Sequence, residues 1–188
     1  MPRAGLTTDR VVEEAETLAD EGEPVTLAVL ARRLGVQVPS LYKHVAGADA
    51  LQRQVANRAK SDLADVLARA AVGKAGPDAV AALAEAYRDW AMEHPGRYAT
   101  TLRAPDANDP EDFAAAGRAI QVIFDALAAY GLTDDDVIDA TRYLRSTLHG
   151  FVALVAAGAF ALPDLDRSFA QMVAVLQQGF AQWPSLRI

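Results

Sequence analysis

The sequence of 188 residues contains no cysteine and only three histidines. The absence of cysteine excludes disulfide bonds and thiolate chemistry, which fits a reducing compartment. The histidines, His44, His94 and His149, fall on separate predicted elements, and no two of them have the spacing of metal ligands. We therefore expect no metal site, no cofactor and no catalytic residues, and an enzyme is the least favoured class of protein.

A long apolar run and a secretory leader are also lacking. The most apolar stretch, from Leu148 to Leu162, is shorter than the roughly 20 residues that span a bilayer. The first residues have no apolar segment and reach an acidic side chain at Asp9. We expect a cytoplasmic protein with no membrane partner.

Strand-like alternation is absent, and apolar residues recur at helical spacing from end to end. The clearest interruption is "VGKAGP", residues 72–77. The pattern predicts an all-α fold, with a helix capped by Thr8 and ended by Gly22, a short helix capped by Thr26 and ended by Gly35, a third helix beginning near Pro39, and further helices at about 48–71, 78–94, 96–103, 110–130, 134–161 and 165–182.

The second and third predicted helices, joined by a tight turn at Gly35, have the layout of a helix-turn-helix. In that motif the second helix enters the major groove of DNA. Five apolar residues can form a small core that holds both helices against the first helix: Leu30, Ala31, Leu34, Leu41 and Val45.

Charge is unevenly distributed in this acidic chain, whose formal net charge is −7. Residues 24–60 contain six Lys or Arg and one acid, whereas residues 9–23 contain seven acids and one Arg. Basic side chains on one face can displace counterions from DNA phosphates. Charge alone fits a solvated helix surface equally well, but Tyr42 beside Lys43 and His44 favours DNA, because their polar ends suit phosphate oxygens.

The segment "TLAVLARRLGVQVPSLYKHVAGADAL", from Thr26 to Leu51, resembles the DNA-binding domain of the tetracycline-repressor family. The likeness is greatest in "LARRLGV" and "PSLYKHV". It implies that bases are faced by Gln37, Val38, Pro39 and Ser40, and that the DNA backbone is held by Thr26, Tyr42, Lys43 and His44. The chain has Val45 and Ala48 where family members often have phenylalanine and lysine, so the grip on the backbone would rest more on N–H groups at a helix start.

Two later stretches, "AYRDWAMEHPGRY" (86–98) and "YLRSTLHGFVALVAAGAF" (143–160), resemble the C-terminal domain of a subgroup of the same family. Together the resemblances extend over most of the chain. They imply an all-helical domain that binds a small molecule and forms a dimer.

A mainly apolar ligand pocket has several candidate residues on different predicted helices, although core packing explains each aromatic equally well. The candidates are Tyr87, Trp90, Phe113, Phe124, Tyr143 and His149, the last of which could equally be an interface histidine.

The last two predicted helices carry long apolar stripes, which suggest more apolar surface than a monomer needs. Packed against their copies, they would form the four-helix interface of a two-fold dimer. The alternative is burial within one subunit. The interface candidates are Phe151, Val155, Phe169, Met172, Val173, Leu176 and Phe180.

These observations and the resemblance predict a one-component transcriptional regulator, a repressor more than an activator. It would bind palindromic operator DNA as a homodimer and respond to a small apolar or amphipathic ligand. The predicted division is a helix-turn-helix domain at 1–47, a connecting helix at 48–71, and a ligand-binding and dimerisation domain at 72–188. The alternative is a constitutive or architectural DNA-binding protein without a small-molecule inducer.

Overall fold

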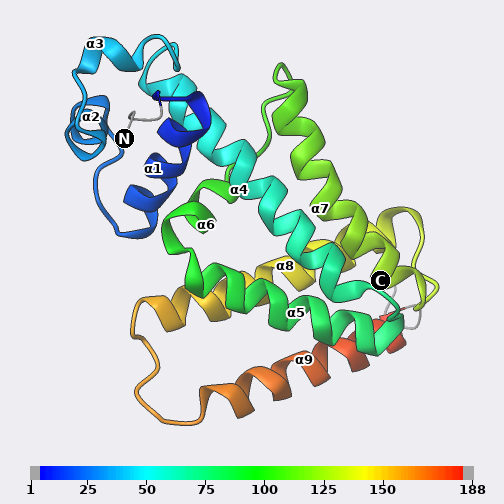
Figure 1. Ribbon diagram of the computed structural model, residues 1–188. Coiled ribbons are helices and arrows are strands. Elements are labelled where there is room, and N and C mark those ends of the chain that lie inside the picture. The colour runs from blue at the N-terminus through cyan, green and yellow to red at the C-terminus, as the bar shows by residue number, and fades with distance from the viewer. Residues whose placement is uncertain (1–4, 184–188) are drawn as a thin grey trace. The chain divides into compact units, whose positions relative to one another are not determined.

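The computed structural model describes residues 5–183, in which helices joined by turns and loops account for the whole architecture (Figure 1). The helices are α1 (Thr8–Asp20), α2 (Leu27–Leu34), α3 (Val38–Leu41), α4 (Ala48–Ala71), α5 (Gly76–Glu93), α6 (Pro95–Thr101), α7 (Pro110–Ala128), α8 (Asp134–Ala156) and α9 (Leu165–Gln182). The all-α prediction is confirmed. Within residues 5–183, none of these helices combines the length and apolar character that a membrane crossing requires.

The described residues form two compact units. Unit 1 comprises residues 5–61 and 93–116, and unit 2 comprises residues 62–92 and 117–183. Both α4 and α7 contribute to each unit, so the units follow packing and not chain order. The functional division at residues 47 and 71 remains a prediction.

Helices α1, α2 and α3 and the start of α4 enclose the core of the N-terminal part of unit 1. The five predicted core residues all take part, with Leu34 half-buried at the edge. The core residues are Val11, Val12, Ala15, Leu18, Leu30, Ala31, Leu41, Val45, Leu51 and Val55. This packing fixes α2 and α3 against α1.

Helix α1 begins one residue earlier than the sequence suggested. The side chain of Thr7, and not that of Thr8, accepts a hydrogen bond from the backbone N–H of Arg10 at 3.2 Å. Two adjacent threonines are equally good caps by residue type, and only the backbone path distinguishes them. Gly22 ends the segment in the left-handed region (φ +73°), as predicted.

Helix α8 ends at Ala156, several residues before the predicted end near 161. Gly158 adopts a left-handed conformation (φ +65°), and the N–H of Ala159 donates to the carbonyl of Leu154 at 2.9 Å. This arrangement closes the helix at a glycine even though the apolar run continues to Leu162.

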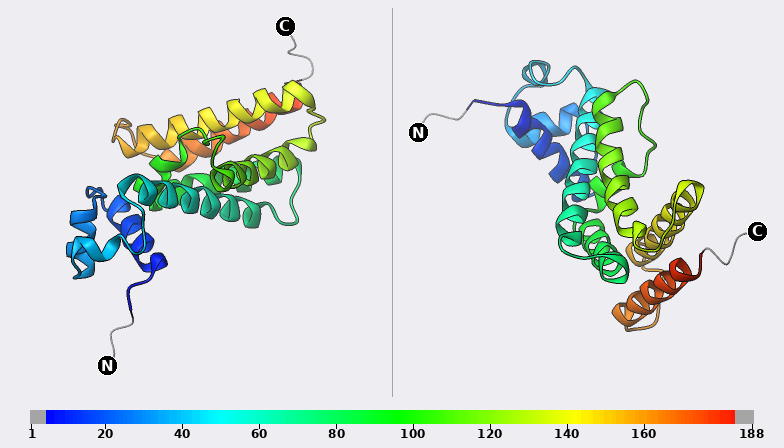
Figure 2. Two further views of the ribbon diagram at one scale, coloured as in Figure 1. Left: turned by 90° about the horizontal axis from the view of Figure 1, so that it is seen from above. Right: turned by 90° about the vertical axis from the view of Figure 1, so that its right-hand side faces the viewer.

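In unit 2, α8 and α9 lie side by side in both views of Figure 2. The ring of Phe151 on α8 meets that of Phe169 on α9 at a centroid distance of 5.1 Å. Helix α5 joins this pair, because Arg88 lies over the ring of Phe169 and pairs with Asp166 at 3.0 Å. The same chain therefore covers much of the inner face of α9.

Candidate nucleic-acid interface

The turn between α2 and α3 is set by capping at both ends of α2. The hydroxyl oxygen of Thr26 accepts from the N–H of Val29 at 3.2 Å, which starts the helix. Gly35 then takes the left-handed conformation (φ 66°, ψ 33°), and the N–H of Val36 donates to the carbonyl of Ala31 at 2.9 Å. Both features were predicted from the sequence. They direct the chain into α3 at a fixed angle.

Helix α3 is short, with Gln37 as its N-cap residue and Pro39 in its first turn. Gln37 and Pro39 are exposed, so their side chains are accessible to bases. Val38 and Ser40 are half-buried, and Val38 packs partly against the core. Of the four residues expected to face bases, Val38 therefore also helps to hold α3 in place.

The residues expected to hold the DNA backbone are accessible to different degrees. Tyr42 is 59% exposed although it is aromatic, and Lys43 beside it is also exposed. His44 is half-buried. Thr26 is exposed, and because its oxygen is the acceptor in the α2 cap, its hydroxyl proton stays available for donation to a phosphate.

The basic surface is smaller than the sequence count suggested, because three of the six cations of residues 24–60 are paired within unit 1. Arg33 donates to Glu21 at 2.8 and 3.1 Å and to Glu14 at 3.0 Å. These hydrogen bonds raise the pKa of the Arg33 guanidinium above its ordinary value, and those with Glu21 have the largest effect. Arg58 lies 3.1 Å from the carboxylate of Glu16 on α1.

The third paired cation is Lys60, which donates to the carboxylate of Asp112 in the interior of unit 1. The other three Lys and Arg of residues 24–60 form no ion pair with any residue of 5–183; they are Arg32, Lys43 and Arg53. A count of charges along the sequence missed this, because the partners of the paired cations come from α1 and α7.

Asp112 connects three segments of unit 1. Its Oδ1 accepts from Lys60 on α4, and its Oδ2 accepts from the N–H of Asp106 at 2.9 Å in the loop that precedes α7. Burial by itself would raise the pKa of Asp112, but the hydrogen bonds from Lys60 and Asp106 outweigh it, so the pKa lies below its usual range.

The end of α1 docks closely on the start of α6, a contact that sequence reasoning did not identify. Asp20 accepts from the backbone N–H of Arg97 at 2.8 Å and from its guanidinium at 2.7 Å. A side chain on Gly96 would meet the carbonyl oxygen of Ala19 at 1.9 Å, so only glycine fits there. The sequence "HPGRY" contains the two residues that make this contact, Gly96 and Arg97, but it does not indicate that their partner is α1.

The six residues expected to line a ligand pocket do not share one environment. Tyr87 and Trp90 are buried in unit 2, and Phe124 and His149 are half-buried there. Phe113 is 61% exposed and belongs to unit 1, so the structure does not support it as a pocket residue.

Tyr143, the sixth pocket candidate, is also largely exposed. Its ring contacts the rings of Phe180 and Trp183 at centroid distances of 6.2 and 6.1 Å. It therefore packs on the C-terminal end of α9. Helical spacing could not predict which neighbour Tyr143 packs against, because an aromatic residue at a given position can face either side of a bundle.

The interface prediction for the α9 stripe needs correction. The side chains of Phe169, Val173, Leu176 and Phe180 are buried within the single chain. They are not available to a second subunit, so the alternative of burial within one subunit applies to them. Phe151, Val155 and Met172 are half-buried, and the large apolar residues exposed on these helices include Leu154 and Val175.

A helix-turn-helix held by its own core, with exposed polar residues at the second helix, defines a DNA-binding regulator. Residues 80–176 match the family model of the tetracyclin repressor-like C-terminal domain. The chain belongs to the tetracycline-repressor family of transcriptional regulators, whose members are not enzymes.

Two relatives carry names of the same class. HTH-type transcriptional regulator Rv0681 of Mycobacterium tuberculosis (strain ATCC 25618 / H37Rv) is 39% identical over 94% of this chain and 82% of that protein. The HTH-type transcriptional regulator YobS of Bacillus subtilis (strain 168) is 36% identical over 85% of this chain and 84% of that protein.

Solved structures show the same fold at lower identity. A protein of unknown function from Rhodococcus sp. RHA1 superimposes with a TM-score of 0.80 at 24% identity, over 96% of this chain and 98% of that one. BioQ with its double-stranded DNA operator gives 0.67 at 21% identity, over 94% and 99% of the two chains. The Streptomyces coelicolor protein ActR in complex with (S)-DNPA gives 0.66 at 19% identity, over 96% and 99%.

Proposed function

We propose that this regulator is a ligand-responsive repressor that binds palindromic operator DNA as a homodimer. The observation that carries the proposal is the exposure of Gln37, Pro39, Tyr42 and Lys43 on and beside α3, which a compact core holds against α1 and α2. The protein would act in the cytoplasm, where its DNA target lies.

In this proposal Gln37, Val38, Pro39 and Ser40 face bases, and Thr26, Tyr42, Lys43 and His44 contact the DNA backbone. Support comes from the exposure of Gln37 and Pro39 at the start of α3 and from Lys43, which forms no ion pair among the described residues. Because Arg33, Arg58 and Lys60 are engaged inside unit 1, few cations of residues 24–60 are left for phosphates. The salt dependence of DNA binding should therefore be modest for a dimer.

The homodimer would form through the outward faces of α8 and α9. Leu154 and Val175 are 47% and 51% exposed on these neighbouring helices, and exposed small residues on α8, such as Ala153, allow close approach. Two copies of such a pair give a four-helix interface with two-fold symmetry. A two-fold dimer presents α3 twice, which is the reason to expect a palindromic site.

The small molecule would bind in the region 72–188, with Tyr87, Trp90, Phe124 and His149 as the remaining wall candidates. The ActR structure was solved in complex with (S)-DNPA and the BioQ structure with its operator, which supports a ligand and DNA as partners for this fold. The uninterrupted helix α4 runs from the predicted DNA-binding domain to residue 71 and is the expected path of coupling.

Two measurements test the proposal. Selection of bound fragments from genomic DNA should return a near-palindromic site next to the regulated genes. A candidate ligand suggested by those genes is then titrated with and without that site, and linkage requires the two affinities for the ligand to differ by the factor by which the ligand weakens DNA binding. Equal ligand affinities would favour the alternative of a constitutive DNA-binding protein, and tighter DNA binding with ligand would contradict release by ligand.

A further inference from the structure

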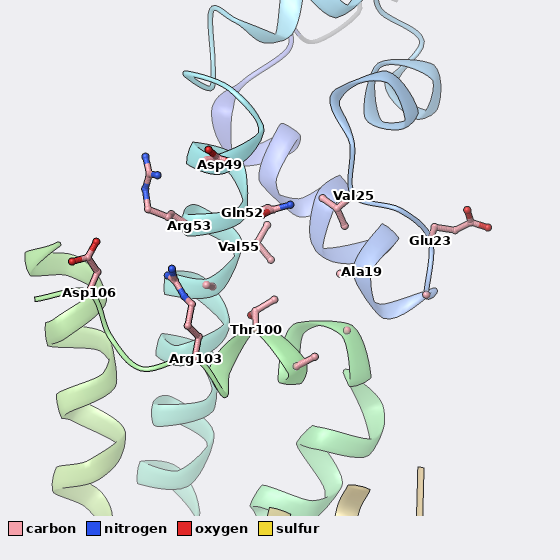
Figure 3. Close-up of a pocket in the computed structure, with 14 residues that line it drawn as sticks. Ala19, Glu23, Val25, Asp49, Gln52, Arg53, Val55, Thr100, Arg103 and Asp106 are labelled. Atoms are coloured by element: carbon pink, nitrogen blue, oxygen red, sulfur yellow. The ribbon is translucent and has the colours of Figure 1, made fainter. Parts of the chain in front are cut away.

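A partly open cavity of about 800 Å³ is lined by residues of unit 1 (Figure 3). Its walls come from the end of α1 and the loop that follows, the first half of α4, α6, and the loop before α7. The volume is within the range of small-molecule sites, roughly 300–1,000 Å³. None of the six candidate ligand residues lines it.

The lining combines an apolar wall with a few polar groups. Val25 and Val55 provide branched apolar side chains, and Ala19, Ala56 and Ala99 add further apolar surface to the lining. Figure 3 shows Gln52 and Thr100 pointing toward the space between α1, α4 and α6. A site of this kind suits a molecule with an apolar body and one polar end.

Arg103 supplies the positive charge at the polar end. Its side chain is half-exposed, and its one contact within the described residues is a terminal N–H 3.5 Å from Asp112. Most of its donors are thus available. Figure 3 shows its side chain rising from the segment after α6 toward α4, whereas Arg53 and Glu23 extend away from the cavity.

The acidic residues of the lining have other roles. Asp106 accepts hydrogen bonds from the backbone and side-chain amides of Asn108, which close its own loop. Asp49 lies in the first turn of α4, where a negative charge is favourable to the helix dipole. Neither compensates the Arg103 guanidinium, which lies at 3.5 Å from the already engaged Asp112.

We propose that this cavity binds a small organic carboxylate, with its carboxylate on Arg103 and its apolar body against Val25 and Val55. A guanidinium binds a carboxylate through two parallel hydrogen bonds, which fixes both the position and the orientation of the ligand. The unit that carries α3 then has an effector site of its own, independent of the site proposed within residues 72–188.

The test uses the purified full chain and octanoate as the probe, with calorimetry to measure affinity and stoichiometry. Octanol and octylammonium have the same apolar body without the negative charge. The informative variants are Arg103→Gln, which removes the charge, and Thr100→Trp, which fills the cavity. Arg69→Gln on α4, outside the cavity and without an ion pair among the described residues, is the matched control, and circular dichroism confirms that each variant folds.

The expected result is saturable binding of one octanoate per chain that both variants weaken at least tenfold and Arg69→Gln leaves unchanged. Arg103→Lys should give an intermediate affinity, because it keeps the charge and loses the two-bond geometry. Absence of saturable binding, equal binding of octylammonium, or full affinity in Arg103→Gln would each overturn the proposal. The last outcome would place octanoate elsewhere in the chain without bearing on DNA binding.

Discussion

Lys60 on α4 and Asp112 on α7 form an ion pair in the interior of unit 1, with both side chains almost completely removed from solvent. The pair fastens the start of α7 and the loop before it to the middle of α4, because Asp112 also accepts from the N–H of Asp106. A buried ion pair of this kind adds little to the free energy of unfolding compared with apolar residues of similar size. Loss of one partner, however, leaves the other charge buried without compensation.

Replacement of Asp112 by Asn should lower the free energy of unfolding at pH 7 by roughly 3–5 kcal/mol, since Lys60 then lies buried beside a neutral group. Because the pKa of Asp112 is depressed in the folded protein, the stability that its charge contributes is present above the unfolded value of about 3.9 and is lost as the pH falls through the folded value. Urea unfolding of both proteins between pH 3 and pH 7 checks this. A difference that does not shrink below about pH 4 would contradict the assignment.

Gly96→Ala should weaken the docking of α1 on α6, because the added carbon would meet the backbone of Ala19. We expect a loss of about 1–3 kcal/mol, typical of overpacking. Gly117→Ala on α7 is the matched control: it has open space around it, and alanine favours a helix, so its stability should be unchanged or raised by up to ~1 kcal/mol. Thermal unfolding compares the stability of the two variants directly. Equal changes in stability would contradict the close contact between Gly96 and the backbone of Ala19.

Lys43→Ala should weaken binding to all DNA sequences alike and lower the slope of log affinity against log salt by about 1 for each half-site. Gln37→Ala should instead relax the preference for one base in each half-site, at about 1–3 kcal/mol. Fluorescence anisotropy with the selected operator and single-base variants separates the two effects. Lys74→Ala, an exposed lysine in the turn after α4, should change neither.

Arg33→Ala should leave the salt dependence of DNA binding unchanged, although Arg33 lies in the helix-turn-helix. Its guanidinium is held by Glu14 and Glu21 from α1 and the turn after it, so the expected change is a lower unfolding midpoint. Fluorescence anisotropy at several salt concentrations measures the salt dependence of DNA binding, and thermal unfolding measures the midpoint. A slope reduced as much as in Lys43→Ala would show that Arg33 contacts phosphate.

Val175→Glu should convert the proposed dimer to folded monomers, because a charge buried in an apolar interface is strongly disfavoured. Leu176→Glu, one position along α9, should instead unfold unit 2, since Leu176 is 1% exposed in the single chain. Light scattering and circular dichroism distinguish these outcomes. Val72→Glu, at an exposed apolar residue in the turn after α4, is the control and should remain dimeric.

The sequence alone determined the local features of this protein. The residues at which α2 begins and ends followed from Thr26 and Gly35, and α4 was predicted at 48–71, where it is found. The inward residues of the helix-turn-helix, such as Leu30 and Leu41, followed from their spacing. These features depend on residues close together in the chain, where capping and periodicity act.

Only the tertiary structure decided which partner each surface has. The charge count could not show that α1 neutralises Arg33 or that α7 supplies Asp112 to Lys60. Apolar periodicity marked Phe169 and Phe180 as inward but could not tell whether their own chain or a second subunit covers them, and α5 and α8 of the same chain provide the cover. A helix specifies its own buried face through its period, whereas the identity of the neighbour depends on contacts between segments far apart in sequence, which no local pattern encodes.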